Sequence, residues 1–192
     1  MILSAGAFAR VGGLLLLAVL LQLSAFSQIG VLGGHADLVV LVVAAIAYWA
    51  GSVSGSAAGF TAGFLLDLLT GATMGASSLV LTAVGYGVGR FREVRDPSHG
   101  LLPVPVGAAA TVAWVTAFAA VSLMLDIGAR VSPLVLRDMV VTVLLNALLA
   151  LPVFTGARKL LRPSLARDPL EVRRRRRPPR EAGPLGLRGM EA

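Results

Sequence analysis

Long apolar runs, with very few charges between them, dominate the first 160 residues of the chain. Between Val11 and Phe91 the only charged side chains are Asp37, Asp67 and Arg90. The runs are continuous and do not alternate residue by residue, which favours membrane-spanning helices over a β-barrel. The pattern therefore predicts an all-α, polytopic membrane helix bundle.

Polar breaks divide this apolar region into six predicted helices, over 11–26 (extending to about 28), 38–50, 55–69, 74–89, 103–125 and 134–157. Pro103 and Pro105 suit the opening turn of the fifth helix, where a missing N–H costs little. The second and third segments are shorter than the roughly 20 residues that a straight span needs. One long helix over 38–69 is therefore an alternative.

The positions of the basic residues decide between these alternatives. Lys and Arg collect on the cytoplasmic flanks of membrane helices, and three flanks are basic here: Arg10, the segment 90–95 and the tail after Arg158. All three face the cytoplasm only if even numbers of spans separate them. We therefore predict six transmembrane helices, with the second and third short and both termini cytoplasmic.

Composition agrees with a membrane domain and adds a second region. Of the 192 residues 56% are hydrophobic and 14% charged, whereas a soluble domain has about 25% charged residues. We expect residues 1–164 to form the transmembrane domain, with an uncleaved first span. Residues 165–192 should form a disordered arginine- and proline-rich cytoplasmic tail.

Basic residues on the cytoplasmic side are predicted to lie at the membrane surface: Arg90, Arg92, Arg95, Arg173, Arg174, Arg175, Arg176 and Arg177. The tail can touch anionic lipid, at about 1 kcal/mol per basic residue, or it can bind a cytoplasmic partner. No nucleic acid is expected, because the arginine run lacks interleaved aromatic residues and a recognisable binding fold.

Glycines recur at every fourth position from Gly51 to Gly75, and Asp67 stands at the one position that breaks the series. Residues four apart lie on one face of a helix, and small residues at this spacing are typical of membrane helix interfaces. We expect a helix-packing or partner interface at Gly55, Gly59, Gly63, Asp67, Gly71, Gly75, Gly85, Tyr86 and Gly89. The glycines would then serve packing within one bundle, with Asp67 at a helix end, or contact with another protein.

No pattern of catalytic, cofactor-binding or metal-binding residues accompanies this ridge. His35 and His99 are far apart and lack metal-ligand spacing, and no histidine in a neighbouring span could activate a serine. The glycine-rich segment 85–89 lies inside an apolar span, where it cannot act as a phosphate loop. We expect no catalysis and no cofactor.

The motif GFxxGFLxDxxxGxxxG at 59–75, followed by GYxxGR at 85–90, resembles the signature of the MreD family of rod-shape-determining membrane proteins. This resemblance covers roughly residues 11–161. It implies a non-catalytic component of the bacterial cell-elongation complex in the plasma membrane. It also implies an MreC-like membrane partner and, indirectly, MreB filaments and peptidoglycan synthases; a homo-oligomer is a further option. The arginine-rich tail lies outside the family pattern.

MreD proteins also resemble the substrate-binding subunits of energy-coupling-factor transporters, which makes a small-molecule-binding transporter subunit the alternative function. Such a subunit needs polar or aromatic residues that converge at one end of the bundle. The outer loops offer only a few candidates, which we expect to form a poor pocket: His35, Asp37, Arg130, Arg137 and Asp138.

Overall fold

The computed structural model describes residues 5–26, 30–31, 33–71, 73–94, 102–125 and 133–161. Within them the helices are α1 (Ala5–Leu21), the π-helical turn η1 (Gln22–Phe26), α2 (Leu38–Ala50), α3 (Ser52–Thr70), α4 (Ala76–Val94), α5 (Pro103–Met124) and α6 (Pro133–Leu161). The strands β1 (Gly30–Val31) and β2 (Gly34–His35) form a small antiparallel hairpin. The all-α prediction is confirmed. Within the described residues, three helices are long and apolar enough to cross a membrane, namely Ser52–Thr70, Pro103–Met124 and Leu134–Leu161.

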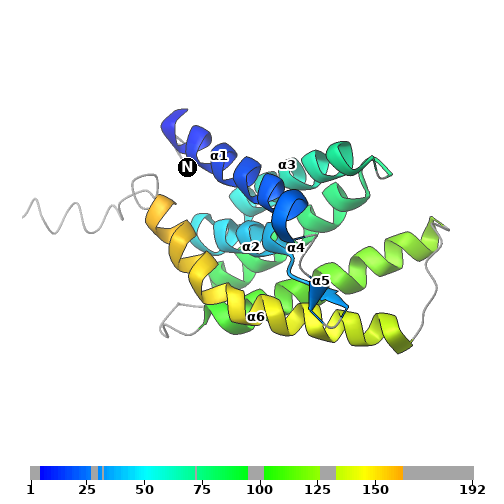
Figure 1. The fold of residues 1–192 in the computed structure, drawn as a ribbon. Helices are drawn as coiled ribbons and strands as arrows, with labels where there is room; N and C mark the ends of the chain where they lie inside the picture. The colour runs from blue at the N-terminus through cyan, green and yellow to red at the C-terminus, as the bar shows by residue number, and fades with distance from the viewer. Residues whose placement is uncertain are drawn as a thin grey trace, which may run out of the picture.

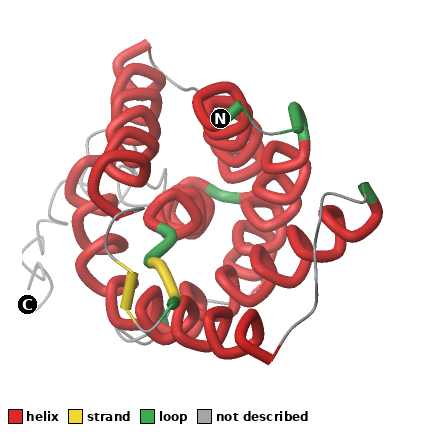
Figure 2. The backbone as a smooth tube through the Cα atoms, turned by 45° about the vertical axis from the view of Figure 1, so that its right-hand side comes forward, coloured by secondary structure: helices red, strands yellow, loops and turns green. Residues whose placement is uncertain are grey.

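Helix α2 forms the centre of the bundle, and the other helices surround it (Figures 1 and 2). Every residue from 39 to 48 is buried. This helix is apolar on all sides, and a helix of that kind is stable only when neighbours cover its whole circumference. The predicted bounds 38–50 agree with the structure.

Helices α3 and α4 form a tight antiparallel hairpin beside α2. Gly51 separates α2 from α3 with a φ of +90°, a conformation that favours glycine. The first turn of α3 is capped from the far end of α4, where Glu93 Oε1 accepts hydrogen bonds from Ser52 N at 2.9 Å and Ser52 Oγ at 2.7 Å. The structure corrects the predicted start of the third helix at residue 55, because α3 begins directly after Gly51.

Helix α6 runs along α5 (Figure 1) and contacts α2 at both of its ends, through Asn146 at the start and Phe154 at the end. It is longer than predicted and ends at Leu161 instead of 157. Its last turns are held against α2, where the Arg158 guanidinium lies 4.8 Å from the centre of the Trp49 ring. Trp49 Nε1 also donates a hydrogen bond to the carbonyl oxygen of Phe154 at 3.3 Å.

Helix α4 likewise extends beyond its predicted end at residue 89. It continues to Val94, so Arg90 and Arg92 lie on a helix and not in the polar loop expected over 90–100. Arg90 forms an exposed ion pair with Glu93 at 3.3 Å, one helical turn away. Arg95 and the predicted tail 165–192 lie outside the described residues.

Candidate functional site

The predicted glycine ridge lies between α3 and α4. A Cβ atom added at Gly59 would lie 2.5 Å from the carbonyl carbon of Leu81, and one at Gly63 would lie 2.5 Å from Ser78 N. At Gly55 the added atom would meet Ala47 of α2 and the backbone oxygen of Gly85. All three positions are buried. Only glycine permits this backbone-to-backbone approach of the two helices.

Two glycines of α4 complete this α3–α4 seam from the other side. A Cβ atom at Gly85 would lie 2.7 Å from the carbonyl carbon of Gly55, and one at Gly89 would lie 2.5 Å from Ser52 N. The seam therefore runs from Ser52 and Gly89 at one end to Gly63 and Ser78 at the other.

Three residues of the predicted interface lie elsewhere. Gly71 and Gly75 have φ values of +65° and +96°, and an added Cβ atom at either position would meet nothing within 4 Å. They form the turn between α3 and α4, where positive φ and not close packing requires glycine. The Tyr86 side chain is 53% exposed, so it points away from the interface within the bundle.

Asp67 caps the start of α4 across this turn. It is 1% exposed, and its Oδ2 and Oδ1 accept hydrogen bonds from Gly75 N at 2.8 Å and Ser77 N at 3.3 Å. The first N–H groups of a helix have no intrahelical partners, and a carboxylate satisfies them and interacts favourably with the helix dipole. Asp67 therefore fixes the α3–α4 hairpin at the end of the seam.

A second polar cluster joins four helices near the start of α2. Asp37 Oδ1 accepts a hydrogen bond from Gln22 Nε2 at 3.2 Å, and Oδ2 accepts one from Trp114 Nε1 at 3.1 Å. Gln22 Oε1 accepts from Leu38 N, and Asn146 Oδ1 accepts from Asp37 N. Burial raises the pKa of Asp37 to about 6, against the lowering effects of the Trp114 hydrogen bond and of nearby His35.

This cluster opens into a cavity of about 400 Å³ under the β1–β2 hairpin, which we call the hairpin pocket. Its lining residues are Gly33, His35, Asp37, Trp114, Val115, Phe118, Ala119, Val135, Asp138, Met139 and Thr142. The pocket includes three of the five residues for which the sequence predicted a poor pocket, His35, Asp37 and Asp138. Trp114, Phe118 and Thr142 complete it, and sequence reasoning missed them because helix pairing, not sequence distance, brings α5 and α6 to the hairpin.

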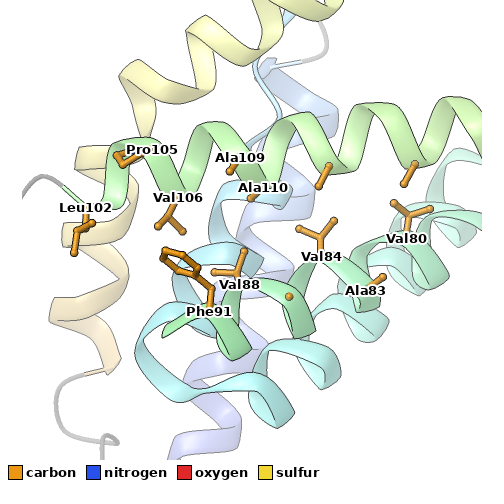
Figure 3. A pocket seen from close by; sticks show the side chains of 13 residues that line it. Val80, Ala83, Val84, Val88, Phe91, Leu102, Pro105, Val106, Ala109 and Ala110 are labelled. Atoms are coloured by element: carbon orange, nitrogen blue, oxygen red, sulfur yellow. The ribbon is translucent and has the colours of Figure 1, made fainter. Parts of the chain in front are cut away.

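A separate apolar groove of about 560 Å³ lies between α4 and α5 (Figure 3). Val84 and Val88 of α4 face Val106 and Ala110 of α5 across it, and Phe91 lies at the end near Pro105. Small residues widen the groove: Ala83, Gly87, Ala109, Ala113 and Ala117.

Comparison with known proteins assigns the chain to a family. The model of the family described as rod shape-determining protein MreD matches residues 6–163, which includes all six α-helices almost completely. The chain belongs to the MreD family. No curated protein and no solved structure matches the chain.

The family assignment places the glycine seam in a rod-shape-determining membrane protein. In this MreD chain the seam is occupied by the chain's own helices α3 and α4, so these glycines do not offer a free surface to another protein. Any contact of this MreD chain with a partner must use another face. The α4–α5 groove and the exposed side of α6 are such faces.

Proposed function

We propose that this chain is a non-catalytic component of the bacterial cell-elongation complex, where it regulates cell shape and peptidoglycan synthesis. It acts through an MreC-like membrane protein and, indirectly, through MreB filaments and peptidoglycan synthases. The observation that carries the proposal is the family match over residues 6–163. The rigid seam between α3 and α4 supports a scaffold, because close backbone packing allows few alternative arrangements of the helices.

The proposal includes a plasma-membrane bundle of six spans with both termini in the cytoplasm. Several basic residues support this orientation because they gather at one end of the bundle. Arg10 and Lys159 line the same surface hollow. Arg92 and Arg158 both lie close enough to Tyr48 to interact with it electrostatically. Since basic residues mark the cytoplasmic side, this end of the bundle faces the cytoplasm.

The MreC-like partner is proposed to insert one apolar helix into the α4–α5 groove. The groove has an almost entirely apolar lining, and the small side chains of Ala109, Ala113 and Ala117 recur at every fourth position along α5. In lipid, small residues at this spacing let a second helix approach closely and gain dispersion contacts.

The test combines rescue of rod shape with co-purification. Cells that lack the native protein receive the wild type, Ala113→Leu in the groove, or the control Ala57→Leu, which replaces an exposed alanine of α3 outside the groove. We expect Ala113→Leu to reduce both rod shape and recovery of the MreC-like protein at normal membrane abundance, and Ala57→Leu to leave both unchanged.

Two results would contradict the proposal. Full rescue by Ala113→Leu would exclude the groove as the partner surface. Failure of the wild-type chain to restore shape or to retain an MreC-like protein would exclude the shape function itself. Recovery of an energising ATPase module in its place would favour the transporter-subunit alternative.

A further inference from the structure

We propose that the hairpin pocket binds a small organic cation, whose charge is held by the carboxylate of Asp37 and by the faces of Trp114 and Phe118. This inference goes beyond the shape function and does not depend on it. The hairpin pocket lies at the start of α2 and of α6, at the end of the bundle away from Arg92, Arg158 and Lys159. Four features of the pocket support it: an uncompensated carboxylate, an aromatic wall, a second acid and a suitable volume.

The Asp37 carboxylate is largely buried, and both of its described hydrogen-bond donors are neutral. These donors are the Trp114 indole and the Gln22 side-chain amide. Buried carboxylates are normally paired with a cation or coordinated to a metal. His35 lowers the pKa of Asp37 electrostatically, and it does so without a described hydrogen bond to the carboxylate. A cationic ligand would supply the missing charge.

An aromatic wall stands beside this carboxylate. The Trp114 and Phe118 rings, one helical turn apart on α5, are stacked with their centres 5.0 Å apart. The hydrogen bond from Trp114 Nε1 to Asp37 holds the Trp114 ring next to the carboxylate. Aromatic faces attract cations, and they attract organic cations best where water is excluded.

Asp138 adds a second acid, and its Oδ1 atom is buried without a hydrogen bond in the described part of the chain. Arg137 Nε forms an ion pair with this Oδ1 atom at 3.7 Å, but its side chain is largely exposed and does not line the pocket. Among the described residues at the pocket, two carboxylates stand against one arginine and one histidine, which leaves one negative charge in excess when the histidine is neutral.

The shape and ligand set favour an organic cation over a metal ion. Ligand sites are typically about 300–1,000 Å³, and this pocket of about 400 Å³ is far larger than one ion needs. No group of three or more metal-ligating acids, histidines or cysteines occurs among the described residues. A protein cage for Ca²⁺ uses about six to eight oxygen ligands, and the pocket offers only two carboxylates and Thr142 for this purpose.

The experiment uses Trp114 as its reporter. The chain has two tryptophans, so Trp49→Phe in the purified full-length protein leaves Trp114 as the only fluorescent indole. The probe is 1-methylnicotinamide, a cationic quencher of tryptophan, and the control ligand is nicotinamide, which is neutral and nearly the same shape. Choline, a cation that does not quench, serves as the competitor.

We expect saturable quenching by 1-methylnicotinamide, about tenfold tighter than by nicotinamide and relieved by choline. Asp37→Asn removes the charge but keeps the side-chain size, and it should weaken the cation about tenfold with little effect on nicotinamide. Phe118→Leu should also weaken the cation, whereas Phe60→Leu, at an exposed phenylalanine of α3, should leave binding unchanged.

Equal quenching by the charged and the neutral ligand, or quenching that rises linearly without saturation, would overturn the proposal. Choline that fails to relieve saturable quenching would do the same. If Asp37→Asn does not fold, two comparisons still test the proposal. They are 1-methylnicotinamide against nicotinamide, and Phe118→Leu against Phe60→Leu. Because the measurement uses purified protein, its failure leaves the shape function unaffected.

Discussion

Replacing Gly59 by alanine tests the α3–α4 seam most directly. The added Cβ atom would lie 2.5 Å from the carbonyl carbon of Leu81 and 2.9 Å from Thr82 N, whereas ordinary van der Waals contact begins at 3.4 Å. The obstructing atoms belong to the backbone of α4, so no side chain can rotate out of the way. The two helices must therefore separate locally by roughly 1 Å, which weakens the dispersion attraction of each affected atom pair by about a quarter to a half.

The cost follows from the dispersion attraction that this separation removes along the seam. If roughly 30 atom pairs each contribute about 0.15 kcal/mol, the separation costs about 1–2 kcal/mol. Overpacking in buried sites costs about 1–3 kcal/mol in general. Alanine offsets up to about 1 kcal/mol of this through its higher helix propensity. We expect a net decrease of up to about 2 kcal/mol in the free energy of unfolding.

Gly87→Ala is the matched control because it makes the same substitution on α4. An alanine Cβ at Gly87 would meet nothing within 4 Å, so only the helix-propensity gain of up to about 1 kcal/mol remains. Both variants are unfolded with increasing SDS from maltoside micelles, and helicity is followed by circular dichroism. The midpoint should fall for Gly59→Ala and rise or stay constant for Gly87→Ala. A Gly59→Ala midpoint equal to or above that of Gly87→Ala would refute close backbone packing at the seam.

Three further predictions concern the two acids and the topology. Asp67→Leu leaves the N–H groups of Gly75 and Ser77 without an acceptor and should lower the free energy of unfolding by about 1–3 kcal/mol in the same assay. Asp67→Asn keeps one acceptor and should lower it less. Equal decreases in the two variants would contradict a capping role. The pKa of Asp37 rises from 3.8 to about 6 on folding, so stability is greatest below pH 3.8 and should fall by up to roughly 3 kcal/mol as the pH rises through 6. Asp37→Asn should flatten this profile, and an unchanged profile in that variant would assign it to another group. A cysteine placed at Ser98 of this cysteine-free chain should react with impermeant maleimide only after the cells are opened, and labelling of intact cells would contradict the six-span topology.

The helices could be predicted from the sequence because their signals are local. The apolar run 38–50 fixes α2, and Pro103 fixes the start of α5, so both agree with the structure. The sequence places the ends of α4 and α6 too early, because hydropathy ends an apolar helix at its first charged residues. Those residues have partners: Glu93 caps α3, and Arg158 stacks on Trp49. Such contacts between distant segments are invisible in local hydropathy.

The glycine pattern illustrates the same limit. Spacing alone groups the glycines of α3, α4 and their turn in one interface. It cannot distinguish a glycine that close helix packing requires from one that a positive φ requires. Gly59 and Gly63 lie against the α4 backbone, whereas Gly71 and Gly75 make the turn. The aromatic part of the hairpin pocket could not be predicted from the sequence for a further reason. Trp114 lies 77 residues from the Asp37 carboxylate that it contacts, and only the packing of α5 against the start of α2 joins them.

The distribution of charge in the folded chain adds an argument for orientation that does not depend on counting spans. Consecutive helices of the bundle alternate in direction, so the start of α1 and the ends of α4 and α6 lie at one end, and these carry basic residues: Arg10, Arg90, Arg92, Arg158 and Lys159. The start of α2, the end of α3 and the start of α6 lie at the other end and carry three acids, Asp37, Asp67 and Asp138, against one base, Arg137. A chain inserted by the positive-inside rule would then expose the hairpin pocket to the outside of the cell. A cation in that compartment would meet Asp37 without crossing the membrane.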